Sequence, residues 1–224
     1  MNIKNCLRTA TLAAAALAGP AFAGVVFSDN FDSDRSSSAL NFNSLLNWDV
    51  SEGTIDYIRN GGWGIKCVGN SGGCLDMDGS TGNAGRITSK QSFSFASGTQ
   101  YTIEMAVSGN QRGGSADSLS FGLIDAAGAV KQLVTPVGPL AWNAAFNTYS
   151  VQFAGSSVAG SWRLFVEGNG GDNVGPILDN YVLRDDRNGA VPEPGSLALA
   201  ALALIGAGML RRRNFNIDSL QVGH

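Results

Sequence analysis

Hydrophobic and polar residues alternate along most of the chain between residues 24 and 186. The clearest runs are Tyr101–Val107, Leu119–Leu123, Tyr149–Phe153 and Trp162–Glu167. A period of two places the apolar side chains of each run on one face of a β-strand. Further short runs of this kind cover Trp48–Val50, Thr54–Ile58, Ile65–Val68, Cys74–Met77, Gln91–Phe95, Val130–Val134 and Ile177–Leu183.

Many short strands separated by clusters of Gly, Asn, Ser and Asp are typical of an antiparallel β-protein. A segment of about 160 residues is long enough to bury one hydrophobic core. The pattern therefore predicts an all-β domain over residues 24–186, built as an antiparallel two-sheet sandwich of the jelly-roll type.

Residues 1–23 have the three parts of a secretory signal peptide. Lys4 and Arg8 form a positively charged start, Ala10–Ala18 is apolar, and Ala21-Phe22-Ala23 offers small residues for cleavage. The apolar run is about half of the roughly 20 residues that span a membrane. We therefore expect cleavage after Ala23 and export of the remaining chain.

The C-terminal region has three consecutive parts. A linker, residues 187–195, contains Pro192, Glu193 and Pro194; residues 196–213 combine an uncharged apolar run with Arg211, Arg212 and Arg213; residues 214–224 are a tail. An apolar helix of about 16 residues is about 24 Å long and spans a bilayer when its arginines reach the surface. Because such arginines stay on the cytoplasmic side, we expect a short C-terminal transmembrane helix with the β-domain outside.

The order of Pro-Glu-Pro, short apolar helix and arginine cluster resembles the PEP-CTERM sorting signal of Gram-negative bacteria. The resemblance implies that an exosortase, a membrane-embedded cysteine protease-transferase, removes the helix near residues 192–194. It also implies transient anchoring in the inner membrane, then transfer to the cell surface or extracellular matrix, where such proteins commonly accompany exopolysaccharide. The eleven-residue tail after the arginines is longer than is usual for this signal.

The composition of the central region excludes several functions. Residues 24–189 contain 10 Lys and Arg against 16 Asp and Glu, a net charge of −6. This region therefore lacks the basic surface that nucleic-acid binding needs. The one histidine of the chain is His224, which excludes a Ser-His-Asp triad, a Cys-His dyad and a His-ligated zinc site from the β-domain.

A second resemblance concerns the β-domain itself. The segments 74–89, 93–112 and 177–183 follow one another as in the galactose-binding-like jelly rolls of carbohydrate-binding modules. In those relatives the fold implies a structural calcium ion and contact with glycan through loops or a concave face. Binding is not inherited with a fold, so the residues themselves must support it.

Cys67 and Cys74 remain after removal of the signal peptide, with six residues between them. Two cysteines at hairpin distance in an exported protein are expected to form a disulfide. A redox or metal-binding pair is the alternative, but the domain contains no histidine and no second pair of cysteines.

Asp76 and Asp78 leave three interpretations open. At positions i and i+2 of an extended strand they point to one side, where they could be solvated beside a turn, ligate calcium or act in catalysis. The stretch lacks the Gly and the late Glu of an EF-hand loop. With Glu104 and Glu167 they support a rival hypothesis, an extracellular polysaccharide hydrolase, which needs two carboxylates facing each other across a cleft.

Candidate calcium ligands lie near both ends of the domain. Asp29, Asp32 and Asp34 belong to the first strand region, and Asp179 belongs to the last strand. The first and last strands of a jelly roll usually lie side by side, which would gather these hard oxygen ligands in a domain without histidine. For Asp179 the alternatives are a surface position or an ion pair with Arg163 or Arg184.

The four tryptophans divide into two pairs. Trp63 stands among glycines and Trp142 follows Pro139-Leu140-Ala141, so both are expected in loops, where exposed flat rings can stack on sugars. Trp48 and Trp162 lie within strand patterns and are expected in the core.

Together these observations favour an exported, non-enzymatic surface or matrix protein with a glycan-binding or structural role beside exopolysaccharide. The expected partners are an exosortase, a glycan and, before processing, the membrane. A structural calcium ion is the one cofactor expected.

Overall fold

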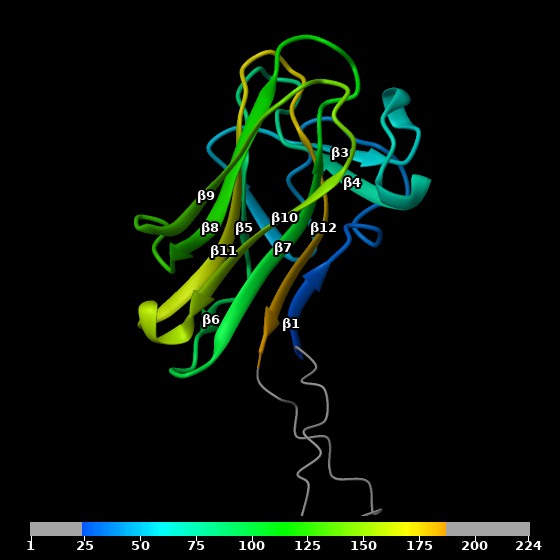
Figure 1. The fold of residues 1–224 in the computed structure, drawn as a ribbon. Helices are drawn as coiled ribbons and strands as arrows, with labels where there is room; N and C mark the ends of the chain where they lie inside the picture. The colour runs from blue at the N-terminus through cyan, green and yellow to red at the C-terminus, as the bar shows by residue number, and fades with distance from the viewer. Residues whose placement is uncertain (1–23, 187–224) are drawn as a thin grey trace, which may run out of the picture.

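The computed structural model describes residues 24–186, which form a two-layer β-sandwich (Figure 1). The strands of this segment make two six-stranded antiparallel sheets, which confirms the predicted fold class. Three short 3-10 helices lie in its loops: η1 (Gly62–Gly64), η2 (Val68–Asn70) and η3 (Gly155–Ser157). Because both sheets and the core between them are complete within residues 24–186, we expect this segment to fold without the flanking regions.

Sheet A has the strand order β10-β7-β12-β4-β3, and β1 pairs with the second half of β12. Its strands are β1 (Gly24–Asp29), β3 (Asp56–Arg59), β4 (Gly73–Asp76), β7 (Gln100–Ser108), β10 (Asn147–Ala154) and β12 (Ile177–Asp185). Sheet B has the order β2-β5-β11-β8-β9, with β6 beside β11. Its strands are β2 (Trp48–Ser51), β5 (Arg86–Ser89), β6 (Phe93–Ser94), β8 (Asp117–Asp125), β9 (Lys131–Leu140) and β11 (Ser161–Asn169).

The apolar faces of the two sheets meet to form the main core. Along β7, every second side chain from Tyr101 to Val107 is buried, as the alternation predicts. Trp48 packs edge-on against Phe27 and Tyr181, with ring centroids 5.5 and 5.0 Å apart. Trp48 and Trp162 are both buried, which confirms their expected place in the core.

The segment Ile65–Val68, predicted as a strand, is a loop that runs into η2. Gly64 and Gly69 flank it with φ angles of +83° and +67°. Glycine adopts this left-handed conformation without a Cβ clash, and an extended strand cannot continue through it. Ile65 and Cys67 are buried all the same, so alternating burial arises here without a strand.

Both ends of the described segment leave the sandwich at the same pole. Gly24 of β1 lies opposite Asp185 of β12 in antiparallel register, and both chain ends point to the bottom of Figure 1. We call the opposite end, with the loops 109–116, 141–146 and 170–176, the loop pole; it is at the top of Figure 1.

The flanking segments lie outside the described residues. They include the expected signal peptide, the Pro192-Glu193-Pro194 motif and the expected transmembrane helix with its arginines. Between residues 24 and 186, every helix is too short or too polar to cross a membrane.

Candidate functional site

The loop between β3 and β4, residues 60–72, folds back over the outer face of sheet A. It contributes Ile65 and Cys67 to a second apolar cluster, separate from the main core. The sheet contributes Ile58, Cys74 and Ile177. Cys67 and Cys74 form a disulfide with their Cα atoms 5.5 Å apart, which confirms the predicted pairing. The disulfide and this cluster hold the segment, here called the disulfide loop, against the sheet.

Two carboxylates bind backbone N–H groups near the ends of the disulfide loop. Asp179 accepts a hydrogen bond from the amide of Val68 at 2.9 Å, and Asp32 accepts one from the amide of Gly73 at 2.7 Å. Asp179 is 3% exposed, so the alternative of a surface position is wrong. The arginine alternative is wrong as well, because the partners of Asp179 are backbone amides.

Gln111 joins the disulfide loop to the loop that carries Trp142. Its side-chain carbonyl accepts a hydrogen bond from the amide of Lys66 at 3.0 Å, and its Nε2 donates to the carbonyl of Lys66 at 2.9 Å. Its own backbone amide donates to the carbonyl of Trp142 at 2.8 Å. Three loops are therefore hydrogen-bonded to one another around this residue.

Trp63 and Trp142 are 46% and 45% exposed, as expected for loop aromatics. Trp63 has a φ angle of +48°, which is rare for a bulky residue. Backbone strain of this kind persists only where the surrounding structure holds it in place, and it concentrates at functional positions. Trp63 belongs to the disulfide loop, and its indole is half-exposed.

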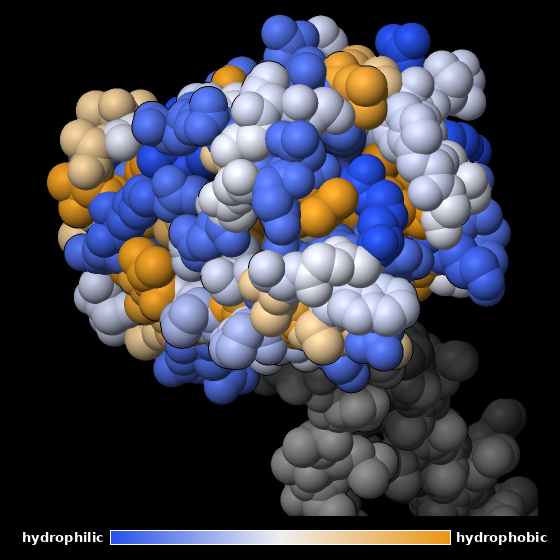
Figure 2. Space-filling view, turned by 90° about the horizontal axis from the view of Figure 1, so that it is seen from above, coloured by the Kyte–Doolittle hydropathy of each residue, from blue (hydrophilic) through white to orange (hydrophobic). Residues whose placement is uncertain are grey.

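A hollow of ≈ 350 Å³ separates the disulfide loop from the loop 141–146. Its lining includes the polar side chains of Lys66, Asn70, Gln111 and Asn143 and the apolar side chains of Val68 and Phe146. From the loop pole the surface is mainly hydrophilic, and its hydrophobic side chains form small separate groups (Figure 2). The candidate site therefore offers mixed polar and apolar contacts rather than a large apolar patch.

Two further hollows continue from the first along the outer face of sheet A. The second, of ≈ 360 Å³, shares Val68 and Phe146 with the first. The third, of ≈ 430 Å³, shares Asn180 and Val182 with the second. Neighbouring hollows thus share lining residues along the outer face of sheet A.

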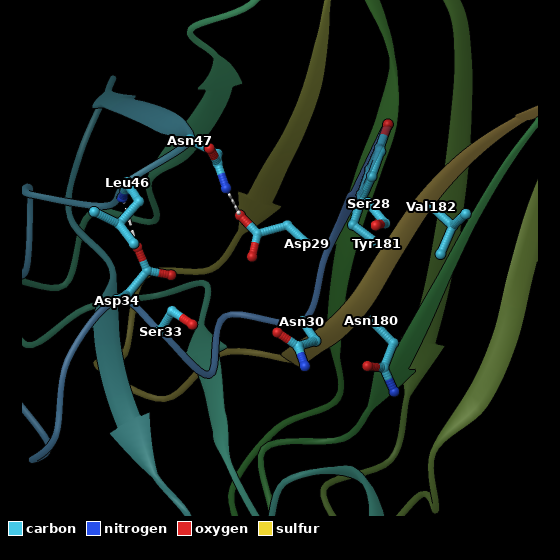
Figure 3. Close-up of a pocket in the computed structure, with 10 residues that line it drawn as sticks. All are labelled: Ser28, Asp29, Asn30, Ser33, Asp34, Leu46, Asn47, Asn180, Tyr181 and Val182. Atoms are coloured by element: carbon cyan, nitrogen blue, oxygen red, sulfur yellow. Dashed lines mark hydrogen bonds between the residues drawn. The ribbon is translucent and has the colours of Figure 1, made fainter. Parts of the chain in front are cut away.

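Two of the four candidate calcium ligands lie at the third hollow. Asp29 and Asp34 line the third hollow (Figure 3), and β1 lies beside β12 as predicted. Burial, together with repulsion by Asp32 and Asp29, raises the pKa of Asp179 to about 6, although two backbone N–H donors oppose this shift. The acidic side chains from both strands are therefore close enough to repel one another.

These carboxylates already accept hydrogen bonds. Asp29 accepts from the amide of Phe31, the Nδ2 of Asn47 and the indole Nε1 of Trp48. Both oxygens of Asp32 and both of Asp179 also accept hydrogen bonds from N–H groups. In the segment 24–186, no three His, Cys, Asp or Glu side chains are arranged to hold a metal ion. The observed geometry anchors loops, and calcium binding at this place stays a prediction.

Asp76 and Asp78 are fully buried, so the interpretation as a solvated turn is wrong. Asp76 forms an ion pair with Arg112 and accepts the amide of Gly175 at 2.8 Å. Burial raises the pKa of Asp76 to about 7, although Arg112 favours the charged form. Asp78 accepts a hydrogen bond from the amide of Gly171 at 2.6 Å. These contacts fix the loop 170–176.

The carboxylates of the hydrolase hypothesis are dispersed. Glu104 lies on sheet A and pairs with Arg184, whereas Glu167 lies on sheet B and pairs with Lys131. No two of the four candidate carboxylates line the same one of the three hollows. These hollows therefore lack the facing pair that glycoside hydrolysis requires.

Sequence reasoning missed two residues that shape the site. The side-chain oxygen of Asn60 accepts a hydrogen bond from the amide of Cys67 at 3.0 Å, and its Nδ2 donates one to the carbonyl of Asn70 at 2.7 Å. Gln111 is the other. The polar run after β7 indicates a loop, but no local signal shows that Gln111 meets Lys66, 45 residues earlier.

Comparison with known proteins identifies the C-terminal segment. Residues 190–213 match the family described as PEP-CTERM protein-sorting motif. This segment contains the Pro-Glu-Pro motif and the three arginines recognised in the sequence. A comparison with curated protein sequences finds no significant match.

Solved structures share the fold of the described domain. An arabinose-bound α-L-arabinofuranosidase, MgGH51, aligns with a TM-score of 0.52 and 13% identity, over 75% of this chain and 27% of that chain. The present chain thus matches about a quarter of that enzyme. A CBM22 xylan-binding domain from Paenibacillus barcinonensis aligns with a TM-score of 0.44 and 11% identity, over 75% and 97% of the two chains. A family 22 carbohydrate-binding module from Clostridium thermocellum aligns with a TM-score of 0.44 and 17% identity, over 74% of this chain and 95% of that chain.

At these identities the likeness concerns the fold and leaves the ligand open. The sorting motif, by contrast, indicates a secreted protein and implies processing by an exosortase at the membrane. The chain therefore carries a PEP-CTERM sorting motif behind an antiparallel β-sandwich domain.

Proposed function

We propose that this protein binds glycan at the loop pole, without converting it chemically, in the extracellular matrix or at the cell surface. One observation carries the proposal: two half-exposed tryptophans stand on loops that Gln111 ties together. Trp48 and Trp162, by contrast, are buried in the core. A pair held in solvent by anchored loops suits a ligand with flat apolar faces.

Sugars have such faces, and their hydroxyl groups both donate and accept hydrogen bonds. Asn70 and Asn143 line the adjoining hollow, whereas the side-chain amide of Gln111 is already bonded to Lys66 and Ser108. An amide side chain also both donates and accepts. Ligand sites in proteins combine aromatic surface with a few placed polar groups in this manner.

The anchoring of the loops favours binding as well. A loop that is already ordered loses less conformational entropy when a ligand binds. The disulfide loop is fixed by Cys67–Cys74, by Asp179 and by Gln111. Trp63 is therefore presented in one position before the ligand arrives.

The expected ligand is a neutral polysaccharide. The net charge of −6 over residues 24–189 disfavours approach of anionic polymers. Export through the sorting motif would bring the domain to exopolysaccharide, which we propose as the ligand in the matrix.

Substitution of the two tryptophans tests the proposal. In the segment 24–186, Trp63→Ala and Trp142→Ala should each weaken binding to a neutral polysaccharide about tenfold, which corresponds to about 1.4 kcal/mol. Affinity electrophoresis over a polysaccharide panel, followed by calorimetry with oligosaccharides, measures the change. Val134→Ala is the control, because Val134 is an exposed hydrophobic residue of β9 in sheet B. Unchanged affinity in both tryptophan variants would place the ligand elsewhere and refute the proposal.

A further inference from the structure

The outermost strand of sheet A, β10, is paired on one side only. It pairs with β7 along its whole length, from Asn147 opposite Val107 to Ala154 opposite Gln100, and with no other strand of the described segment. The loop 141–146 joins it to β9, which belongs to sheet B. The outer edge of β10 therefore presents backbone N–H and C=O groups that a further strand can bind.

The other outer strands of the two described sheets are interrupted, covered or short. β9 contains Pro136 and Pro139 and has two register shifts against β8. The outer side of β3 is occupied, because Ala39 and Tyr57 exchange backbone hydrogen bonds. β2 and β6 have four and two residues, and β1 has a register shift against β12. Such features keep an edge strand from pairing with another chain.

β10 shows a different pattern. Its eight residues, Asn147–Ala154, include no proline, no glycine and no charged side chain, and its register with β7 is continuous. At about 3.3 Å per residue, the edge is about 26 Å long. A long, regular and uncharged edge is a site for the addition of a strand from another chain.

The side chains of β10 suit a second copy of the same strand. Tyr149 and Val151 face the core but are only partly buried against it. An antiparallel pair of β10 strands centred on Ser150 places Tyr149 opposite Val151 of the second copy, and Thr148 opposite Gln152. Aromatic and β-branched residues form favourable cross-strand pairs, and no like charges meet along the strand.

We propose that two copies of this domain associate through β10, in antiparallel register around Ser150, so that two six-stranded sheets form one continuous sheet. Identical edges that meet about a two-fold axis give a closed dimer. One strand pair buries less than the roughly 800 Å² per partner of a standard interface, so the expected dissociation constant is about 100 μM. The inference is independent of glycan binding.

The orientation of the two copies has a consequence for the loop poles. Because the paired strands run antiparallel, the two loop poles point in opposite directions. If the loop pole binds glycan, as proposed above, one dimer joins two polysaccharide chains.

Sedimentation equilibrium of residues 24–186 between about 10 μM and about 1 mM tests the association. The mean mass should rise from that of a monomer toward that of a dimer over this range. A segment that stays monomeric at the highest concentration overturns the proposal, whether or not it binds glycan.

Charges introduced at two exposed positions of β10 test which edge is used. Thr148 and Gln152 are both exposed and lie opposite each other in the proposed dimer. Thr148→Lys with Gln152→Lys brings like charges together twice, whereas Thr148→Lys with Gln152→Glu brings opposite charges together twice. The second double variant should dimerise about tenfold more tightly than the first. Equal association of the two variants overturns pairing through β10.

Cysteine substitution tests the register. Ser150→Cys places two thiols opposite each other, with Cα atoms about 4.5–5.5 Å apart, a distance that a disulfide spans. Mild oxidation at high protein concentration should therefore cross-link this variant. The matched control Gln152→Cys faces Thr148 of the second copy and should stay uncross-linked on a non-reducing gel. Equal cross-linking of both variants, or of neither, overturns the register around Ser150.

Discussion

Single polar side chains position the candidate site by binding the backbone of loops. Gln111 holds both backbone groups of Lys66, Asn60 holds Cys67 and Asn70, and Asp179 holds Val68. A typical hydrogen bond of this kind contributes about 0.5–1.5 kcal/mol to stability. Removal of such a side chain should therefore affect the stability of the domain together with the position of the tryptophans.

Gln111→Ala tests this positioning role. Loss of its two solvent-exposed side-chain hydrogen bonds to Lys66 should lower the free energy of unfolding by about 0.5–1.5 kcal/mol. It should also weaken glycan binding, because the loops of Trp63 and Trp142 lose their connection. Urea denaturation and calorimetric titration measure the two effects. Gln152→Ala, at an exposed position of β10, should change neither; a Gln111→Ala protein as stable as the wild type would contradict the positioning role.

Two buried aspartates make the stability of the domain depend on pH. The pKa of Asp179 is raised to about 6 and that of Asp76 to about 7, both mainly by burial. The folded state therefore holds these protons more tightly than the unfolded chain, whose aspartates have pKa values near 3.9. Unfolding free energy should rise as the pH falls from about 7.5 to about 5.

Urea denaturation at both ends of this range measures the trend, and Asp179→Asn should make it shallower. A urea midpoint at about pH 5 that equals or falls below the one at about pH 7.5 would contradict this prediction. It would show that the pKa values of Asp179 and Asp76 are not raised in the folded state.

The calcium hypothesis makes a separate prediction. If Asp29, Asp32 and Asp179 share an ion, the ion relieves their mutual repulsion, and millimolar calcium should raise the melting temperature. Asp179→Asn should reduce that gain. Identical melting curves with calcium and with a chelator would leave these carboxylates as anchors for loop amides.

Elements of the sandwich differ in how far the sequence predicts them. Strands such as β7 bury one face against the main core, so their alternation identifies them. The segment Ile65–Val68 has a similar pattern but buries its residues in the second apolar cluster, outside the sandwich. The Cys67–Cys74 pair could be predicted from spacing and export. Its place over the outer face of sheet A could not, since Asp179 and Gln111, which fix it, come from distant parts of the chain.

The disulfide should matter more for the site than for the fold. Replacement of Cys67 and Cys74 by serine should destabilise the domain by about 2–3 kcal/mol, since the closed loop is short. The main core is independent of this loop, so the fold should persist. Glycan affinity should fall, because Trp63 loses its fixed position. Thermal melting and titration measure the two effects; full affinity in the double variant would remove the disulfide loop from the binding site.

The two ends of the described segment and the candidate site lie at opposite poles of the molecule. Both ends of the described segment leave at one pole, and the two tryptophan-bearing loops meet Gln111 at the other (Figure 1). Strands of nine residues, such as β12, span about 30 Å between the poles. The chain therefore leaves the described segment at the pole opposite the candidate site.

The most direct test observes the four indole N–H groups of the folded domain by NMR during titration with a neutral glycan. Trp63 and Trp142 are half-exposed, so their signals should shift on binding. Trp48 and Trp162 are internal controls, because their Nε1 groups donate to Asp29 and to the carbonyl of Ala159 and should not move. Shifts confined to Trp63 and Trp142 are the result expected for glycan binding at the loop pole. A glycan that binds by calorimetry while these two signals stay in place would contradict it.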